Sequence, residues 1–356
     1  MTSISHIPGY PVDLPHIEQE LMKFWQQIAS TESNHAVIRS TTLNLILLVQ
    51  SNEQFKEAQN LVPHIIEHHP SRIILLYFDP DNKSEHIEST ISAFCQPPRS
   101  GGRQICCEQI ILYTGPESCG HIRGAVLPLL IPDLPSFLAT LDSDLLQACE
   151  IKPLLQIPDR LILNLPRFVD QQKDLLPLLQ LIREHTPHTA ISDLLWAELT
   201  PWREAAAQCF DAPEAIEKLN HIKKIKIESY GKHRSIPALL FTAWLASRLQ
   251  WPSVKKDPEN SYVFQDIKVS HTLRSGKPDG ALARVSFAFD QDKPEMYCEI
   301  ERGEPGKLVI RDPLGEKTLD IDTEPGKLLC DELDFLHADS VFLESIEWFA
   351  KFGEFE

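Results

Sequence analysis

The sequence has no apolar run approaching the roughly 20 residues that a helix needs to cross a bilayer. Its apolar runs at 43–49 and 175–182 have the lengths of strands or core helices. The first residues also lack a basic segment followed by an apolar one, so no secretory signal is predicted. We therefore expect an intracellular, cytoplasmic protein that does not bind a membrane.

Basic residues are scarce relative to acidic ones. The 356 residues include 34 Lys and Arg but 51 Asp and Glu, which gives a net charge of −17 at pH 7 with His neutral. Because nucleic-acid binding relies on clustered basic residues that neutralise phosphates, this balance argues against a nucleic-acid partner. The apolar content of 42% is ordinary for a soluble globular protein, and the length favours two domains.

Disulfide and zinc motifs are also missing. None of the eight cysteines forms a CxxC pair, and their scatter through a long intracellular chain predicts free thiols. Cys106 and Cys107 are adjacent in a predicted strand, where neighbouring side chains point to opposite faces, so we expect one to be buried and the other exposed. An exposed thiol there would be a candidate redox group, with Cys119 as a possible partner. The alternative is that both are small residues that fill the strand.

No known catalytic or cofactor motif is present. The sequence contains no GxGxxG, no GxxxxGK followed by Ser or Thr, and no GxSxG. His64 and His68 lie one helical turn apart, but the intervening Glu67 is misplaced for an HExxH zinc site and no third ligand is identifiable. We interpret the two histidines as part of a solvated helix end. The sequence thus predicts no catalytic residues, no cofactor and no metal site.

Short apolar strands alternate with helices in the first half of the chain, which predicts an α/β domain with a mostly parallel sheet at 1–190. The strand patterns lie at 41–49, 72–78, 103–113, 136–140 and 160–163. Helical patterns lie at 14–28, 52–67, 142–151 and 170–185, and Pro63 predicts a kink or an early stop in the second of these. Residues 1–12 are expected to form an irregular arm, and 85–94 a short helix.

The second half, 212–356, is predicted to form an α+β domain with an antiparallel sheet. Strand patterns recur at short intervals, at 222–230, 262–269, 282–290, 296–302, 307–311 and 317–322. One long helix is expected at 237–251 with Ser235 as its cap, and a closing helix at 330–349.

The stretch at 193–211, DLLWAELTPWREAAAQCFD, joins the two halves, and we predict a junction segment at 191–211. Thr200 is the expected helix cap, with Pro201 at the first helical position. Trp202, Ala205, Ala206 and Cys209 share one helical face and are expected to pack inward.

Charges of opposite sign gather at the two ends of the second half. A basic cluster lies at 223–234, whereas the closing helix carries six acidic residues between 331 and 347. Solvated faces are the usual explanation, but such patches also suit steering toward a protein partner or an anionic ligand.

Several separated stretches together resemble the OpcA family of glucose-6-phosphate dehydrogenase assembly proteins. They are TTLNLILLV (41–49), HPSRIILL (69–76), ICCEQIIL (105–112), LPLLIPDLPSFL (127–138), DRLILN (159–164), DLLWAELTPWREAAAQCFD (193–211) and, more weakly, IPALLFTAWLASRLQW (236–251). The resemblance rests on the order and spacing of these stretches, since no single motif among them is diagnostic.

The resemblance implies a non-enzymatic protein that binds glucose-6-phosphate dehydrogenase, promotes its active oligomer and raises its activity. It would thereby support NADPH production by the oxidative pentose phosphate pathway. In photosynthetic relatives this partnership is linked to thiol redox control. Trp196, Trp202 and Arg203 are residue types that anchor interfaces, so they are candidates for partner contact or for a rigid junction.

The alternative is an enzyme. An α/β fold could place a site for a sugar phosphate or nucleotide at the carboxyl ends of the first domain's strands.

Overall fold

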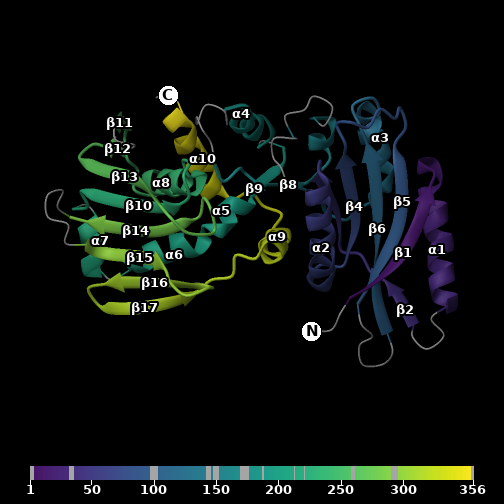
Figure 1. The fold of residues 1–356 in the computed structure, drawn as a ribbon, viewed down its shortest axis with the longest axis horizontal. Coiled ribbons are helices and arrows are strands. Elements are labelled where there is room, and N and C mark those ends of the chain that lie inside the picture. The colour runs from purple at the N-terminus through teal and green to yellow at the C-terminus, as the bar shows by residue number, and fades with distance from the viewer. Residues whose placement is uncertain are drawn as a thin grey trace. The chain divides into compact units, whose positions relative to one another are not determined.

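Apolar runs in the first half of the chain form the central strands of one sheet, and the alternating segments of the second half form another (Figure 1). The computed structural model describes residues 4–31, 36–96, 103–141, 146, 152–168, 176–186, 188–211, 213–219, 221–257, 261–289 and 296–353. The predicted helix at 142–151 therefore lies almost entirely outside the described residues.

The chain divides into two units by its internal contacts. The first unit comprises 1–164, 181–192 and 325–338, and the second comprises 165–180, 193–324 and 339–356. These units are discontinuous in sequence, unlike the uninterrupted domains predicted at 1–190 and 212–356.

The sheet of the first unit has nine strands, in the order β1-β5-β6-β4-β3-β7-β8-β9, with β2 also paired to β6. Their bounds are β1 (Ser5–Val12), β2 (Ala36–Arg39), β3 (Leu43–Val49), β4 (Ser71–Phe78), β5 (Glu88–Cys95), β6 (Arg103–Thr114), β7 (Ser136–Thr140), β8 (Arg160–Leu163) and β9 (Ala190–Asp193). The pairs among β2, β3, β4, β6, β7 and β8 are parallel. The predicted parallel α/β sheet is confirmed.

Helices cover this sheet. They include α1 (Ile17–Thr31), α2 (Asn52–His68) and α3 (Ile122–Val126), whereas α4 (Leu176–His185) is divided between the two units at residue 181. Figure 1 shows α1 and α2 on either side of the strands, and every residue of β3 is buried. This is the pattern of a parallel sheet with both faces covered, and it explains why these strands read as unbroken apolar runs. α2 does not stop at Pro63 but continues to His68.

Two predictions for the first unit are wrong. Residues 5–12 form the edge strand β1 rather than an irregular arm, and 88–95 form strand β5 rather than a helix. β5 pairs antiparallel with both β1 and β6. An edge strand tolerates the prolines of β1 because one side of its backbone needs no partner. The sequence could not show either strand, since each is stabilised by pairing with a distant segment.

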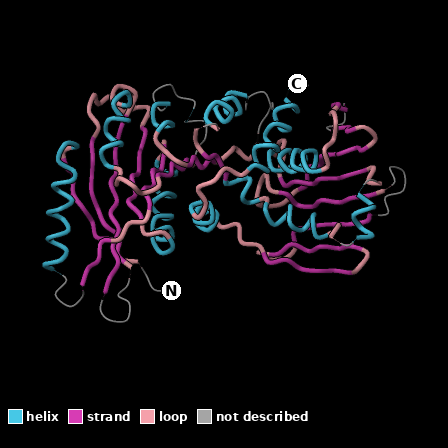
Figure 2. The backbone as a smooth tube through the Cα atoms, turned by 180° about the vertical axis from the view of Figure 1, so that it is seen from behind, coloured by secondary structure: helices cyan, strands magenta, loops and turns pink. Residues whose placement is uncertain are grey.

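The sheet of the second unit has eight strands, in the order β11-β12-β13-β10-β14-β15-β16-β17. Their bounds are β10 (Lys224–Tyr230), β11 (Lys255–Asp257), β12 (Ser261–Phe264), β13 (Ile267–Arg274), β14 (Leu282–Ala288), β15 (Met296–Arg302), β16 (Lys307–Asp312) and β17 (Gly315–Asp320). Every pair is antiparallel except β10 with β13. The antiparallel α+β prediction is confirmed, and Figure 2 shows the strands of each unit together.

The helices of the second unit include α5 (Leu194–Glu198), α6 (Thr200–Gln208), α7 (Pro213–Leu219), α8 (Ile236–Arg248) and α10 (Ser340–Gly353). α8 packs against α10, and Ser235 caps α8 as predicted, because its hydroxyl accepts the N–H of Ala238. Within the described residues, no helix has both the length and the apolar character needed to cross a membrane.

Two further predictions need correction. The expected strand at 262–269 is a hairpin of β12 and β13 that turns at Gln265, whose φ is 56°. The expected closing helix is two helices, α9 (Pro325–Leu333) and α10, and α9 belongs to the first unit. Asp339 interrupts the helical pattern, because its carboxylate caps α10.

His271 on β13 is an ionisable group in the packing between α8 and the second sheet. The Thr242 hydroxyl donates to the Ala238 carbonyl at 2.9 Å, so it accepts a hydrogen bond from His271 Nε2 at 2.8 Å. Burial, together with the positive charge of Arg234, lowers the pKa of His271 to about 3.

We predict that His271 makes the second unit less stable in mild acid. Between pH 6.5 and about 3 the unfolded chain binds a proton at this residue and the folded chain does not, so stability falls as the pH falls. The full shift would lower the free energy of unfolding by about 2 kcal/mol at pH 5, and we expect about 1 kcal/mol because His271 keeps some solvent exposure. Urea unfolding at pH 7 and pH 5 should show this extra loss in the wild type relative to His271→Asn. An equal pH dependence in both proteins would contradict it.

Candidate functional site

The junction segment begins with a fully buried carboxylate. One oxygen of Asp193, Oδ1, accepts the N–H of Trp196 at 2.8 Å, and the other, Oδ2, accepts the N–H of Leu165 at 2.8 Å. Asp193 is 0% exposed. Asp193 therefore caps helix α5 and also fixes a second segment of the second unit.

Trp196 links helix α5 to the residues at the start of α10. Its indole Nε1 donates to Asp339 Oδ2 at 2.8 Å, and Asp339 Oδ1 accepts the N–H groups of Val341 and Phe342 at the start of α10. The rings of Trp196 and Phe342 lie 5.5 Å apart. We call Leu165, Asp193, Trp196, Asp339 and Phe342 the junction cluster. It connects the three places where the chain begins a segment of the second unit, at 165, 193 and 339.

Arg203 covers the outer side of Trp196. Its guanidinium carbon lies 3.6 Å from the indole centroid, and its nitrogens donate to the Trp196 carbonyl and the Thr200 hydroxyl, both at 2.8 Å. A guanidinium stacked on an indole face gains cation–π energy of about 0.5–2 kcal/mol. Two of the three candidate residues, Trp196 and Arg203, are thus in direct contact.

The prediction that Thr200 caps the helix is wrong. Only Leu199 separates α5 from α6, and Leu199 has a helical backbone (φ −81°, ψ −7°) with no side-chain cap. Thr200 therefore lies inside a nearly continuous helical segment, and its hydroxyl accepts from Arg203 instead. The residue that caps this helical segment is Asp193, and its position directly before the apolar run of α5 is the sequence pattern that could have indicated it.

The predicted inward face of α6 is confirmed. Trp202, Ala205, Ala206 and Cys209 are all less than 5% exposed. Trp196 is buried as well, so direct partner contact by either indole would require this segment to open. Partner contact and a junction role for Trp196, Trp202 and Arg203 both stay predictions, and the packing described here lies within the second unit.

Glu198 is a buried acidic residue that no sequence motif marks. Its carboxylate accepts two hydrogen bonds from Arg167, with Oε2 at 2.5 Å from Nη2. Because the pair joins α5 to the chain just after Leu165, it supports the same segments as the junction cluster.

The expectation of free thiols is wrong for four cysteines. Disulfides join Cys95 to Cys106 across β5 and β6, and Cys209 to Cys298. These pairs could not be read from spacing, because strand pairing and helix packing bring the partners together. Cys107, Cys119 and Cys330 are buried and outside these disulfides, and Cys149 lies outside the described residues.

Neither candidate redox cysteine is exposed. Cys106 and Cys107 are both 0% exposed, which corrects the expectation that one of them faces solvent. β6 is covered on both faces at this point, and burial raises the pKa of Cys107 to about 12. Because the thiolate is the reactive form, this environment opposes reaction of Cys107 with a soluble oxidant.

The first unit has a surface depression of about 990 Å³ at the carboxyl end of β6, next to Tyr113. Its lining includes three carboxylates, from Asp13, Glu20 and Glu88. The described lining contains no Lys or Arg, and Lys23 beside it is paired with Glu20 at 2.6 Å. His16 and His86 also line it, so the carboxylates outnumber the groups that could pair with a phosphate.

A second depression, of about 700 Å³, lies in the second unit. Helix α7 and the turn between β16 and β17 line it, with Lys218, Tyr297, Leu314 and Lys317 among the lining residues. Leu314 is 78% exposed, which is unusual for a large apolar side chain.

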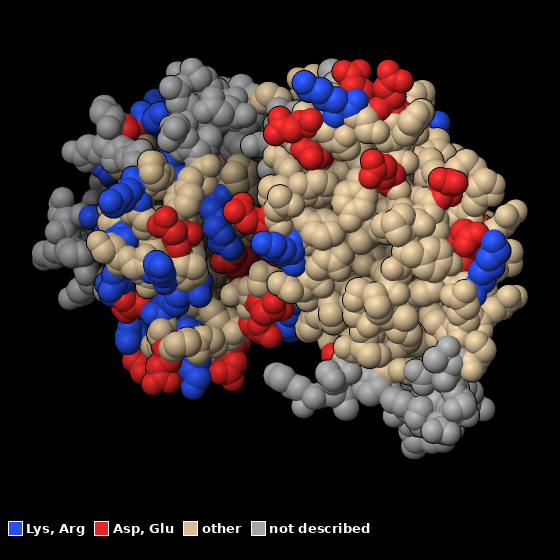
Figure 3. Space-filling view, turned by 45° about the vertical axis from the view of Figure 1, so that its right-hand side comes forward, with Lys and Arg blue, Asp and Glu red and all other residues tan. Residues whose placement is uncertain are grey.

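The predicted basic cluster does not form an unbroken positive surface. Lys223 pairs with Asp266, and Lys226 pairs with Glu228 at 2.5 Å. In Figure 3, blue and red side chains are intermingled at the left, over the second unit. Steering of an anionic ligand by this cluster is correspondingly weaker than the sequence suggested.

Among the described residues, one group of three side chains has the chemistry of metal ligands. It consists of His64, His68 and Cys330, which all lie in the first unit and outside the junction cluster.

Comparison with known protein families gives two consecutive matches. Residues 62–180 match the model described as the glucose-6-phosphate dehydrogenase subunit N-terminal domain. Residues 189–346 match the model described as the C-terminal domain of the same subunit. Both models belong to the OpcA family.

Similar proteins occur among curated sequences under the name "Putative OxPP cycle protein OpcA". The one from Synechocystis sp. is 32% identical over 210 residues, covering 59% of this chain and 42% of the relative. The one from Nostoc punctiforme is 33% identical over 235 residues, covering 65% of this chain and 45% of the relative. The matched part of the chain thus spans less than half the length of these relatives.

A search of solved structures found a dehydrogenase from Clostridium difficile. It has a TM-score of 0.45 and 10% identity, covering 88% of this chain and 98% of that one. A likeness at this level supports no conclusion about fold or function.

We predict that removing the Asp193 carboxylate destabilises the second unit. Asp193→Ala should lower the free energy of unfolding by about 2–4 kcal/mol, because it removes a helix cap and leaves the buried Leu165 N–H without its acceptor. Asp193→Asn keeps one side-chain oxygen and should lose roughly half as much. The matched control is Asp211→Ala, an exposed position of the same segment, expected within about 0.5 kcal/mol of wild type. Similar urea unfolding curves for Asp193→Ala and Asp211→Ala would refute the prediction.

Proposed function

The chain belongs to the OpcA family, and from this premise we propose that it is a non-catalytic assembly factor of glucose-6-phosphate dehydrogenase. In this proposal it binds the enzyme, favours its active oligomer and raises its activity, which supports NADPH production by the oxidative pentose phosphate pathway. The observation that carries the proposal is the pair of family matches, which follow one another along the chain at 62–180 and 189–346.

The proposed activation has a thermodynamic requirement. An effector shifts an enzyme toward its active state only by binding that state more tightly than the inactive one. A tenfold shift needs about 1.4 kcal/mol of differential binding. A surface that is already rigid loses less entropy on binding, so more of its contact energy is available for this difference.

The junction cluster would provide such rigidity within the second unit. Its two carboxylates, the fully buried Asp193 and the partly exposed Asp339, each accept more than one N–H group. Hydrogen bonds to charged groups are worth about 1.5–3 kcal/mol each, so these contacts hold α5 and α10 firmly. In this proposal the segment at 193–211, with Trp196 and Trp202, holds the docking surface in place and does not itself contact the partner.

We propose that the depression lined by α7 and the β16–β17 turn is part of the surface that contacts the dehydrogenase. Leu314 is 78% exposed and Ile216 on α7 is 53% exposed, so apolar area is available there. Tyr297 is an aromatic anchor held in place by Phe210, whose ring stacks on it at 5.5 Å, and by Lys218 at 5.0 Å. An apolar and aromatic centre with charged neighbours is typical of protein interfaces.

The proposal predicts a direct effect on the cognate dehydrogenase. Adding the purified chain should raise the initial rate of NADPH formation and increase the enzyme's molar mass in light scattering. An unchanged rate, substrate affinity and molar mass would reject the assembly function. Turnover of a sugar phosphate by the chain alone would instead favour an enzyme.

The contact surface predicts a position-specific loss of activation. Leu314→Asp should raise the concentration for half-maximal activation at least about tenfold, because it places a charge where apolar area would be buried. Leu273→Asp is the matched control, since Leu273 is another exposed leucine of the second unit, at 48%. Equal activation by both variants would place the interface elsewhere without affecting the assembly function itself.

A further inference from the structure

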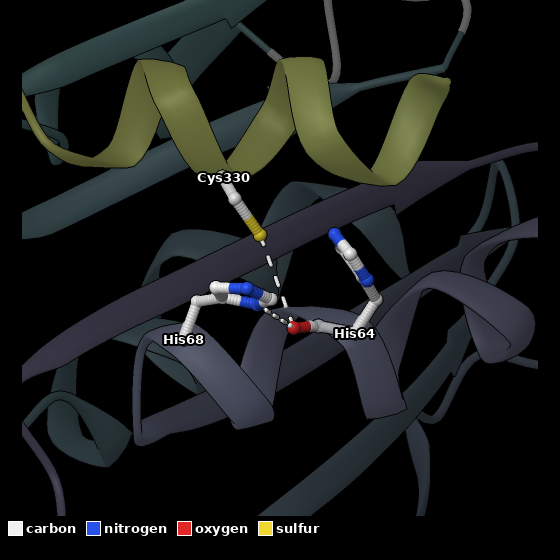
Figure 4. A group of neighbouring side chains, drawn as sticks. All are labelled: His64, His68 and Cys330. Carbon is white, nitrogen blue, oxygen red and sulfur yellow. Dashed lines mark hydrogen bonds between the residues drawn. The ribbon is translucent and has the colours of Figure 1, made fainter. Parts of the chain in front are cut away.

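Helix α9 packs against helix α2, although the two are at opposite ends of the sequence. His64 and His68 lie one turn apart on α2, and Cys330 comes from α9 (Figure 4). The figure shows the three side chains in the space between the two helices, with the thiol extending from α9 toward the histidines. The tertiary structure thus supplies the third potential ligand that the sequence did not show.

The spacing of these side chains is close to that of a metal site. One ligand atom from each residue lies within 4.8 Å of the other two. In a tetrahedral zinc site with Zn–N near 2.05 Å and Zn–S near 2.3 Å, ligand atoms are roughly 3.3–3.6 Å apart. The observed limit of 4.8 Å exceeds these spacings, and we infer that side-chain rotation brings the three atoms together when a metal binds.

The hydrogen bond of His68 leaves Nε2 as the ring nitrogen that can bind a metal. Its Nδ1 lies 2.9 Å from the carbonyl oxygen of His64. Because a carbonyl only accepts, Nδ1 carries the proton and donates, and the lone pair is on Nε2. Metal-binding histidines commonly donate their second ring nitrogen to a backbone carbonyl in this way.

Other contacts fix α9 at this position independently of the three ligands. Arg160 pairs with Glu332 on α9 and donates to the carbonyl of His337. His69 Nε2 lies 3.1 Å from the carbonyl oxygen of Cys330. The backbone that carries Cys330 is therefore held in place, which lowers the entropic cost of assembling a site.

We propose that His64, His68 and Cys330 bind a zinc ion, with water as the fourth ligand. Two imidazole nitrogens and a thiolate favour Zn²⁺ over Mg²⁺ or Ca²⁺, which prefer oxygen ligands. Cys330 is buried and His68 is exposed, so the group lies at the edge of the α2–α9 contact, where water can reach the metal. On binding, the Cys330 thiol releases its proton to water and the sulfur donates to the metal, whose charge does not change. The ion would join α9 to α2 and stabilise the first unit.

The site is tested with the full chain stripped of metal by a chelator. Titration of Zn²⁺ against a competing chromophoric chelator should show one ion per chain with a Kd below about 1 µM, and binding should raise the thermal midpoint. With Co²⁺, a thiolate-to-cobalt charge-transfer band should appear. Cys330→Ser should abolish that band, and His68→Gln should weaken zinc binding at least tenfold.

Two variants of the first unit serve as matched controls. His121→Gln removes an exposed histidine, and Cys119→Ser replaces a buried thiol outside both disulfides. Both should bind zinc as the wild type does. If Cys330→Ser does not fold, the exposed His68→Gln variant still decides the question. Failure to bind zinc at micromolar concentrations, a cobalt complex without the thiolate band, or unchanged binding in His68→Gln would overturn the proposal.

Discussion

The second unit depends on the hydrogen bonds made by the buried carboxylate of Asp193. A fully buried charge is costly unless hydrogen bonds compensate it, and here two backbone N–H groups from different segments do so. Trp196 then links this carboxylate's helix to a second capping carboxylate, Asp339. Three segments far apart in sequence are therefore held by two acidic side chains and one indole, and the loss of Asp193 leaves the buried Leu165 N–H without its acceptor.

The first unit depends in a similar way on a segment that comes late in the chain. Residues 325–338 belong to it, and Arg160 holds them through Glu332 and the carbonyl of His337. Its complete packing can form only after nearly all of the chain has been made. Because such non-local contacts require closure of a long loop, they are slow to form. A metal ion between α2 and α9 would strengthen the same connection.

The two proposals concern different units and different chemistry. The proposed dehydrogenase contact lies around Leu314 in the second unit, whereas the proposed zinc site lies between α2 and α9 in the first. Each has its own measurement, so one can fail without the other.

The sequence by itself determined the elements whose signals are local. The buried strands β3, β4 and β6 follow from apolar runs, the Ser235 cap from its hydroxyl, and the inward face of α6 from helical spacing. Only the tertiary structure decided what depends on distant partners: β1 and β5 as strands, the two disulfides, and α9 as part of the first unit. The same holds for Asp193 bound to Leu165 and for Cys330 beside two histidines. The reason is physical, because local spacing fixes which face of a helix or strand is apolar, whereas strand pairing and helix packing decide which remote residue meets it.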